Sequence, residues 1–98
     1  MARRNSFIDS STGEADNGIR AILGYDDEEE NGRKLRRILL KVINNELTAR
    51  QKEIIMLYYF KEMDIVSISR QLGVTPQAVS AVMARARVRM YKVLQYYI

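Results

Sequence analysis

Small and polar residues follow the single proline of the chain, Pro76, at the spacing of a helix. Gln77 can form two hydrogen bonds with an adenine edge, and Ser80 can bond several bases. Ala81 can meet a thymine methyl group, and Arg85 can reach a guanine or a phosphate. These residue types on one helix face are typical of a surface that reads the major groove of duplex DNA.

Phosphate contacts are the expected source of affinity, because arginine neutralises the charged DNA backbone. We expect the phosphate-binding and groove-facing residues in and around the same segment. They are Arg50, Arg70, Thr75, Gln77, Ser80, Ala81, Arg85, Arg87 and Arg89. Arg87 and Arg89 flank Val88 on different faces of the predicted helix, so they cannot both meet one DNA strand.

Two helices joined by a three-residue turn are predicted over residues 64–80. Asp64 and Thr75 can cap these helices, because their side-chain oxygens accept hydrogen bonds from the first-turn amides. Gly73 stands where a left-handed residue commonly ends a helix. Val74 is expected to fill the corner between the helices. The pattern is a helix-turn-helix, which makes double-stranded DNA the leading partner.

Two more helices are predicted before the helix-turn-helix. The first begins near Arg33. Its apolar residues recur at helical spacing: Leu35, Ile38, Leu39, Val42 and Ile43. Thr48 and Gln51 form a capping box, in which each side chain bonds the backbone of the other residue. The helix that they open runs to about Lys61 and is the most apolar, so we expect it to be the most buried. The last helix continues to about Tyr96.

The charge of the chain is divided unevenly. Residues 1–31 carry eight acidic and three basic side chains, whereas residues 32–98 carry four acidic and thirteen basic ones. We therefore expect a flexible, mostly disordered acidic arm over residues 1–32, with one helical turn around Ile19 to Leu23 docked on the body. Residues 33–98 should form an all-α fold, a small helical bundle with the helix-turn-helix. The acidic run 26–30 is either a solvated linker or a competitor of DNA for the basic face.

The composition excludes several classes of function. The chain has neither cysteine nor histidine, which removes thiolate and imidazole metal ligands and the commonest general base. It has no glycine-rich phosphate loop and no paired carboxylates in a cleft-forming pattern, so we expect no enzyme and no cofactor. No apolar run is long enough to cross a bilayer and no signal-peptide core is present, which predicts a cytoplasmic protein without a membrane partner.

The chain from Leu47 to Leu94 resembles region 4 of bacterial sigma factors, the module that binds the promoter −35 element. The matching motifs are Leu47-Thr48-Ala49-Arg50-Gln51, Ile54-Ile55-Met56-Leu57-Tyr58-Tyr59-Phe60, Leu72-Gly73-Val74-Thr75 and Ala84-Arg85-Ala86-Arg87. The resemblance implies a helix-turn-helix fold of bacterial or phage context, with double-stranded DNA and RNA polymerase as partners. It also implies a phosphate contact for Arg50, which matches a family residue with that role.

The chain departs from the family pattern at several positions. Housekeeping sigma factors begin the recognition helix with an arginine and a glutamate, and a glutamine follows one turn later. The corresponding positions here hold Pro76, Gln77 and Ala81, which predicts a different target sequence. Glu62 replaces a frequent glycine. Region 2 of sigma factors, which binds the polymerase and melts DNA, has no counterpart, so we expect a stand-alone region 4 domain.

Three functions remain open at this point. The first is a sequence-specific DNA-binding transcription regulator that acts at promoters. The second is an interaction protein that binds RNA polymerase or another sigma factor without reading DNA. The third is a phage DNA-packaging adaptor, because small terminase subunits carry a helix-turn-helix after a similar Leu-Thr-x-x-Gln start. The apolar end of the last helix, from Met90 to Tyr96, either packs on the body or supports a homodimer.

Overall fold

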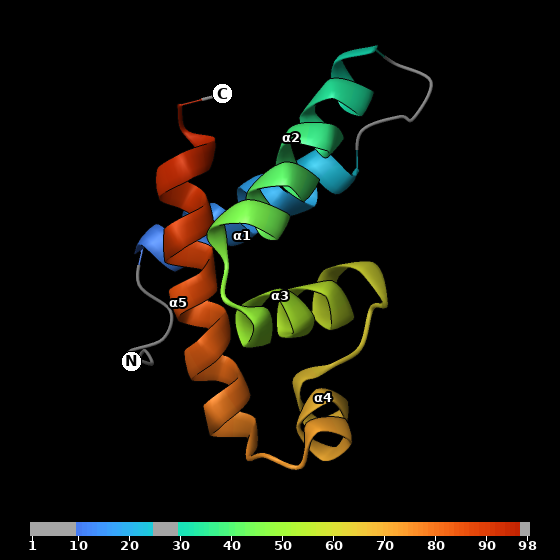
Figure 1. Ribbon diagram of the computed structural model, residues 1–98, viewed down its shortest axis with the longest axis vertical. Coiled ribbons are helices and arrows are strands. Elements are labelled where there is room, and N and C mark those ends of the chain that lie inside the picture. The colour runs from blue at the N-terminus through green and yellow to red at the C-terminus, as the bar shows by residue number, and fades with distance from the viewer. Residues whose placement is uncertain (1–9, 25–29, 97–98) are drawn as a thin grey trace.

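The computed structural model describes residues 10–24 and 30–96, and in this part of the chain short turns join helices and there are no strands (Figure 1). The elements are α1 (Ser10–Leu23), α2 (Glu30–Glu46), α3 (Ala49–Ile55), the π-helix η1 (Met56–Phe60), α4 (Ile65–Leu72) and α5 (Pro76–Leu94). The predicted all-α bundle is confirmed. None of these helices is long and apolar enough to span a bilayer.

Helix α5 is the axis of the fold, because it contacts α1, α2, α3 and α4. In Figure 1 it runs along the long dimension of the molecule, with α4 beside its first turns and α1 and α2 beside its later ones. The sequence instead predicts the helix opened by Thr48 as the most buried element. That helix, α3 with η1, buries Ile54, Ile55 and Tyr59, and α5 supplies buried residues over almost its whole length, from Val79 to Leu94.

Two apolar cores lie along α5. The larger core joins α1, α2, α3, η1 and the second half of α5. Its buried residues are Ile19, Ile22, Leu39, Val42, Ile43, Leu47, Ile55, Tyr59, Ala86, Met90 and Leu94. The smaller core lies inside the helix-turn-helix and consists of Ile54, Ile68, Val79 and Met83. The side chains at helical spacing in the sequence therefore fill the cores as predicted.

The predicted helix caps are all present. Thr48 and Gln51 form the reciprocal capping box at the start of α3. The Asp64 carboxylate accepts a hydrogen bond of 2.7 Å from the amide of Ser67, which fixes the start of α4. Gly73 ends α4 with a φ of 69°, the left-handed conformation that glycine adopts without a steric penalty. These local signals confirm the helix-turn-helix.

The segment between α3 and α4 differs from the prediction. The helix expected to run to Lys61 changes at Met56 into the π-helix η1, in which the backbone hydrogen bonds span one more residue than in an α-helix. The turn that follows holds Glu62 at a φ of 56°, an unusual conformation for a residue with a side chain. This is the position at which the sigma factors that the chain resembles often have glycine. Glu62 thus adopts a conformation that glycine accepts more readily.

Helix α1 is longer than the single docked turn that the sequence predicts. It spans fourteen residues, Ser10–Leu23, and buries Ile19 and Ile22 in the larger core. Helix α2 also begins at Glu30, one turn before the expected Arg33. The rest of the predicted arm, residues 1–9 and 25–29, lies outside the described residues, and its flexibility stays a prediction. Most of the acidic run 26–30 lies outside them as well.

The structure also tests the predictions for Val74 and for the apolar end of the last helix. Val74 is 37% exposed and does not fill the corner between α4 and α5, because Ile68, Val79 and Met83 already occupy it. Near the end of α5, Leu94 is buried, which confirms that this helix packs on the body. The described residues give no support to a homodimer through this helix, because its buried stripe is already used within the chain.

Candidate nucleic-acid interface

Helix α5 presents two different faces along its first three turns. One face is buried in the smaller core through Val79 and Met83. The opposite face carries Gln77 and Arg85, which are exposed, and Ala81, which is half-buried. Because the buried face anchors the helix, the outward side chains are held in a fixed orientation and can approach a DNA groove together.

Each residue expected to face the groove is accessible in this arrangement. Gln77 and Arg85 are exposed and engage no described side chain, whereas Ser80 is half-buried at the edge of the outward face. Ala81 has no polar group and permits a close approach of the helix to the bases. Thr75 is exposed, and its hydroxyl accepts a hydrogen bond of 3.1 Å from the amide of Ala78, so its first role is to cap α5.

Two of the expected phosphate-binding arginines lie on the helices that precede α5. Arg50 is on the first turn of α3, where its side chain is 50% exposed and 3.3 Å from the Glu53 carboxylate. An ion pair as exposed as this contributes little to stability, so a phosphate can replace Glu53 at small cost. Arg70 is exposed on α4. Arg50 and Arg70 thus lie on the two helices that share the smaller core with α5.

The structure separates Arg87 from the rest of the expected site. Its side chain is only 15% exposed and faces the body of the protein. Its Nε donates a hydrogen bond of 2.8 Å to the Tyr59 hydroxyl, and its Nη2 lies 3.5 Å from the Asp16 carboxylate. The Arg87 guanidinium is thus bound within the protein, which does not favour the expected DNA contact, and that contact stays a prediction.

Arg89 is paired within the protein but remains partly exposed. Its Nη2 lies 2.6 Å from the Glu46 carboxylate at the end of α2, and about half of its side chain is exposed. The pair joins α5 to α2 far along the helix from Gln77. A phosphate contact of Arg89 stays a prediction.

Sequence reasoning missed a cluster of polar side chains between α1, η1 and α5, which we call the α1 clasp. It consists of Asp16, Arg20, Tyr58, Tyr59 and Arg87. The Asp16 carboxylate accepts hydrogen bonds from Tyr59 and, at 3.0 Å, from Arg20. Arg20 also donates to the Tyr58 hydroxyl at 3.2 Å. Both guanidiniums lie 5.5–5.7 Å from the centres of the two tyrosine rings. The only local signal in the sequence is the Asp16–Arg20 spacing of four residues.

The contacts within the α1 clasp shift the pKa values of Asp16 and Tyr59. Burial alone would raise the pKa of Asp16, but the Tyr59 hydrogen bond and the charges of Arg20 and Arg87 outweigh it and hold that pKa below its ordinary value. Burial raises the pKa of the Tyr59 phenol, and the neighbouring Asp16 raises it further. Asp16 is therefore ionised and Tyr59 neutral at physiological pH, the states in which Tyr59 donates to Asp16.

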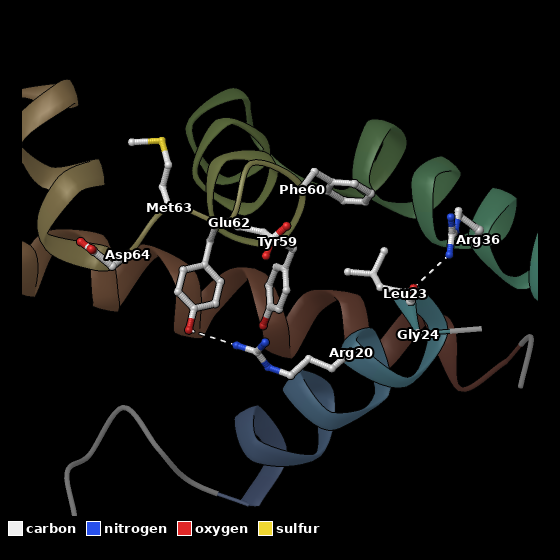
Figure 2. Close-up of a pocket in the computed structure, with 10 residues that line it drawn as sticks. Arg20, Leu23, Gly24, Arg36, Tyr59, Phe60, Glu62, Met63 and Asp64 are labelled. Carbon is white, nitrogen blue, oxygen red and sulfur yellow. Dashed lines mark hydrogen bonds between the residues drawn. The ribbon is translucent and has the colours of Figure 1, made fainter. Parts of the chain in front are cut away.

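An open hollow of ≈ 770 Å³ lies beside the clasp, between the end of α1 and η1 (Figure 2). Its charged lining residues are Arg20, Arg36, Glu62 and Asp64. Arg36 also donates a hydrogen bond of 3.0 Å to the carbonyl of Leu23, which joins α2 to the end of α1. Two guanidiniums and two carboxylates balance one another, so the hollow is not suited to an anion such as a phosphate.

A family model described as Sigma-70, region 4 matches residues 36–90, which is more than half of the chain. The chain therefore belongs to the sigma-70 region 4 family, whose members are helix-turn-helix DNA-binding domains without a catalytic role. No curated protein and no solved structure matches the chain. The matched range begins within α2 and ends within α5, so α1 lies outside it.

Proposed function

We propose that this region 4 domain is a sequence-specific DNA-binding transcription regulator that acts at promoters. The observation that carries the proposal is the pair of faces on α5. The inner face is fixed by fully buried Val79 and Met83, and the outer face holds Gln77 and Arg85 exposed and unengaged by described side chains. A helix supported in this way fits the major groove with its first two turns.

The proposed contacts divide into two groups with different effects. Gln77, Ser80 and Ala81 meet base edges and determine the sequence that is read. Arg50 and Arg70 meet phosphates from α3 and α4, which adds affinity without discriminating between sequences. One bidentate contact discriminates by about 1–3 kcal/mol, so the short outer face of α5 provides modest specificity.

The proposal is tested first by selecting bound duplexes from random DNA with the full chain. An enriched motif supports it, and uniform recovery of all sequences contradicts it. Gln77→Ala and Ser80→Ala should then change the sequence preference. Arg50→Ala should weaken all sequences alike and make the dependence of log affinity on log salt concentration shallower by about 0.9.

A matched control for Arg50→Ala is Lys41→Ala, which removes one exposed cation from α2, outside the helix-turn-helix. It should leave affinity and salt dependence nearly unchanged. Equal losses on the selected sequence and on random DNA for Gln77→Ala would argue against base reading by that residue.

Family membership supports RNA polymerase as a second partner of the same domain. Promoter binding would place the protein in the bacterial cytoplasm, with the polymerase that it recruits or blocks. Binding to purified polymerase without any DNA preference would replace the proposal with that of an interaction protein. A ring of many copies, seen by mass measurement in solution, would replace it with a DNA-packaging adaptor.

A further inference from the structure

We infer that helix α1 is a displaceable brace for the recognition helix α5, so that DNA binding strengthens when α1 docks and weakens when it is released. This inference rests on the proposed function and adds its regulation. Three observations carry it: the position of α1, the weakness of α1 as an isolated helix, and the single carboxylate that joins α1 to α5.

Helix α1 supports the part of α5 that the helix-turn-helix does not. It lies outside the family match at residues 36–90, yet it contacts both α5 and α2 (Figure 1). Ile19 and Ile22 are buried in the same core as Ala86 and Met90 of α5. Without α1, this part of α5 would lose the apolar cover that Ile19 and Ile22 provide and keep only that of α2, α3 and η1.

The sequence of α1 does not favour a helix without such docking. Gly13 and Gly18 lie in its interior, and each glycine lowers helix stability about two- to fivefold relative to alanine. The first turn carries no acidic residue to interact with the helix dipole. A helix of only fourteen residues is marginal in water even with a favourable sequence. Formation of α1 is therefore coupled to its docking on α5 and α2.

Asp16 is the polar connection between the two helices. It is on α1, and its carboxylate binds Arg87 of α5 together with Tyr59 and Arg20. Arg87 follows Arg85, a proposed DNA contact, by two residues on the same helix. Release of α1 removes the only described carboxylate that pairs with Arg87, whose side chain is 15% exposed while α1 is docked.

Release of α1 weakens DNA binding because the proposed contacts come from three helices at once. Arg50, Arg70 and Gln77 meet one duplex together only when α5 holds its position relative to α3 and α4. A protein that must first restore this arrangement binds more weakly than one in which it is already formed. The coupling is reciprocal, so DNA must also favour the docked form of α1.

The test uses the full chain, a duplex from the selection experiment, and hydrogen exchange at the amides of Ile19 and Ile22. Asp16→Asn should speed this exchange about tenfold, because a hydrogen-bonded charge is lost. It should weaken DNA binding about threefold. This change is smaller than the change in exchange, because exchange follows the fraction of molecules with α1 released, whereas affinity follows the fraction with α1 docked. The direction is informative, since the substitution makes the protein more positive and would otherwise strengthen DNA binding.

Two further variants separate the loss of the brace from the change in net charge. Glu62→Gln makes the same change in net charge at a residue outside the clasp. It should leave the exchange of the α1 amides unchanged, and any effect of the added positive charge should strengthen DNA binding. Gly18→Ala adds a methyl group that meets nothing within 4 Å, and it should favour α1 about two- to fivefold. In the Asp16→Asn background, Gly18→Ala should therefore restore DNA affinity, which a direct effect of Asp16 on DNA would not allow.

The inference is overturned if Asp16→Asn speeds exchange in α1 while DNA affinity stays equal to that of Glu62→Gln. It is also overturned if a saturating duplex does not slow α1 exchange in the unmodified protein. Should Asp16→Asn fail to fold, exchange in the unmodified protein still decides, because a saturating duplex must slow α1 exchange if docking and DNA binding are coupled. Failure of the proposed function is seen separately, as an unmodified protein that docks α1 but selects no DNA.

Discussion

Two arginines of α5 separated by one residue should respond to the same substitution in opposite ways. Arg85 is exposed and engages no described side chain, whereas Arg87 is 15% exposed and bound to Tyr59 and Asp16. Replacement of each by methionine keeps a long apolar side chain and removes one positive charge. The two variants are therefore matched in chemistry and differ only in location.

The structure gives the expected size of each effect. Arg87→Met removes a hydrogen bond between a charged group and Tyr59, worth about 1.5–3 kcal/mol, and leaves Asp16 with fewer partners. We expect a loss of about 2–3 kcal/mol in the free energy of unfolding, or a fall in Tm of about 8–24 °C for a domain of this size. Arg85→Met should change the free energy of unfolding by less than about 0.5 kcal/mol.

The DNA measurements should show the reverse order. Arg85→Met should make the dependence of log affinity on log salt concentration shallower by about 0.9, the loss of one phosphate contact. Arg87→Met should leave this slope unchanged, and any loss of affinity should be the same at every salt concentration. Unfolding by heat and by urea, and fluorescence anisotropy with a labelled duplex between about 50 and 200 mM salt, measure these quantities. A stable Arg87→Met protein with a shallower slope would refute the assignment.

Three further predictions concern the turns and caps. Glu62→Gly should stabilise the fold by about 0.5–1 kcal/mol and Gly73→Ala should destabilise it by about 1 kcal/mol, measured by urea unfolding, because both positions have a positive φ. Hydrogen bonds from Ser67 hold the pKa of Asp64 below its usual 3.8. The stability that Asp64 gives is thus present above pH 3.8 and is lost as the pH falls through its lower folded-state pKa. Asp64→Asn should therefore make the Tm depend less on pH in acid solution. Thr75→Ala should cost about 1 kcal/mol and Thr75→Ser much less, since serine keeps the cap; equal losses in urea would contradict a capping role.

The helix-turn-helix could be predicted from the sequence because its signals are local. The Asp64 cap, the left-handed Gly73 and the Thr75 cap each act within four residues, so no knowledge of the rest of the fold is needed. The π-helix could not be predicted in the same way. An apolar run such as Met56–Phe60 has the same composition whether its backbone bonds span four residues or five.

The place of α1 and the role of Arg87 could not be predicted because they depend on distant partners. Asp16 and Arg87 are 71 residues apart in the sequence, and no periodic pattern links them. Arginine is usually exposed, so a largely shielded one is identified only when its carboxylate and hydroxyl partners are known. Arg85, by contrast, needs no partner within the chain, and its exposure follows from the position of Val79 and Met83 on the other side of the helix.

The two cores along α5 determine how stably the DNA-reading surface is folded. The smaller core has four fully buried side chains surrounded by partly buried ones, which is a small core for α4 and the start of α5 to fold on alone. Its stability therefore depends on the larger core, because the single helix α5 contributes side chains to both cores. A random mutagenesis screen for lost DNA binding should therefore return positions such as Leu39, deep in α2, as readily as positions that touch the duplex.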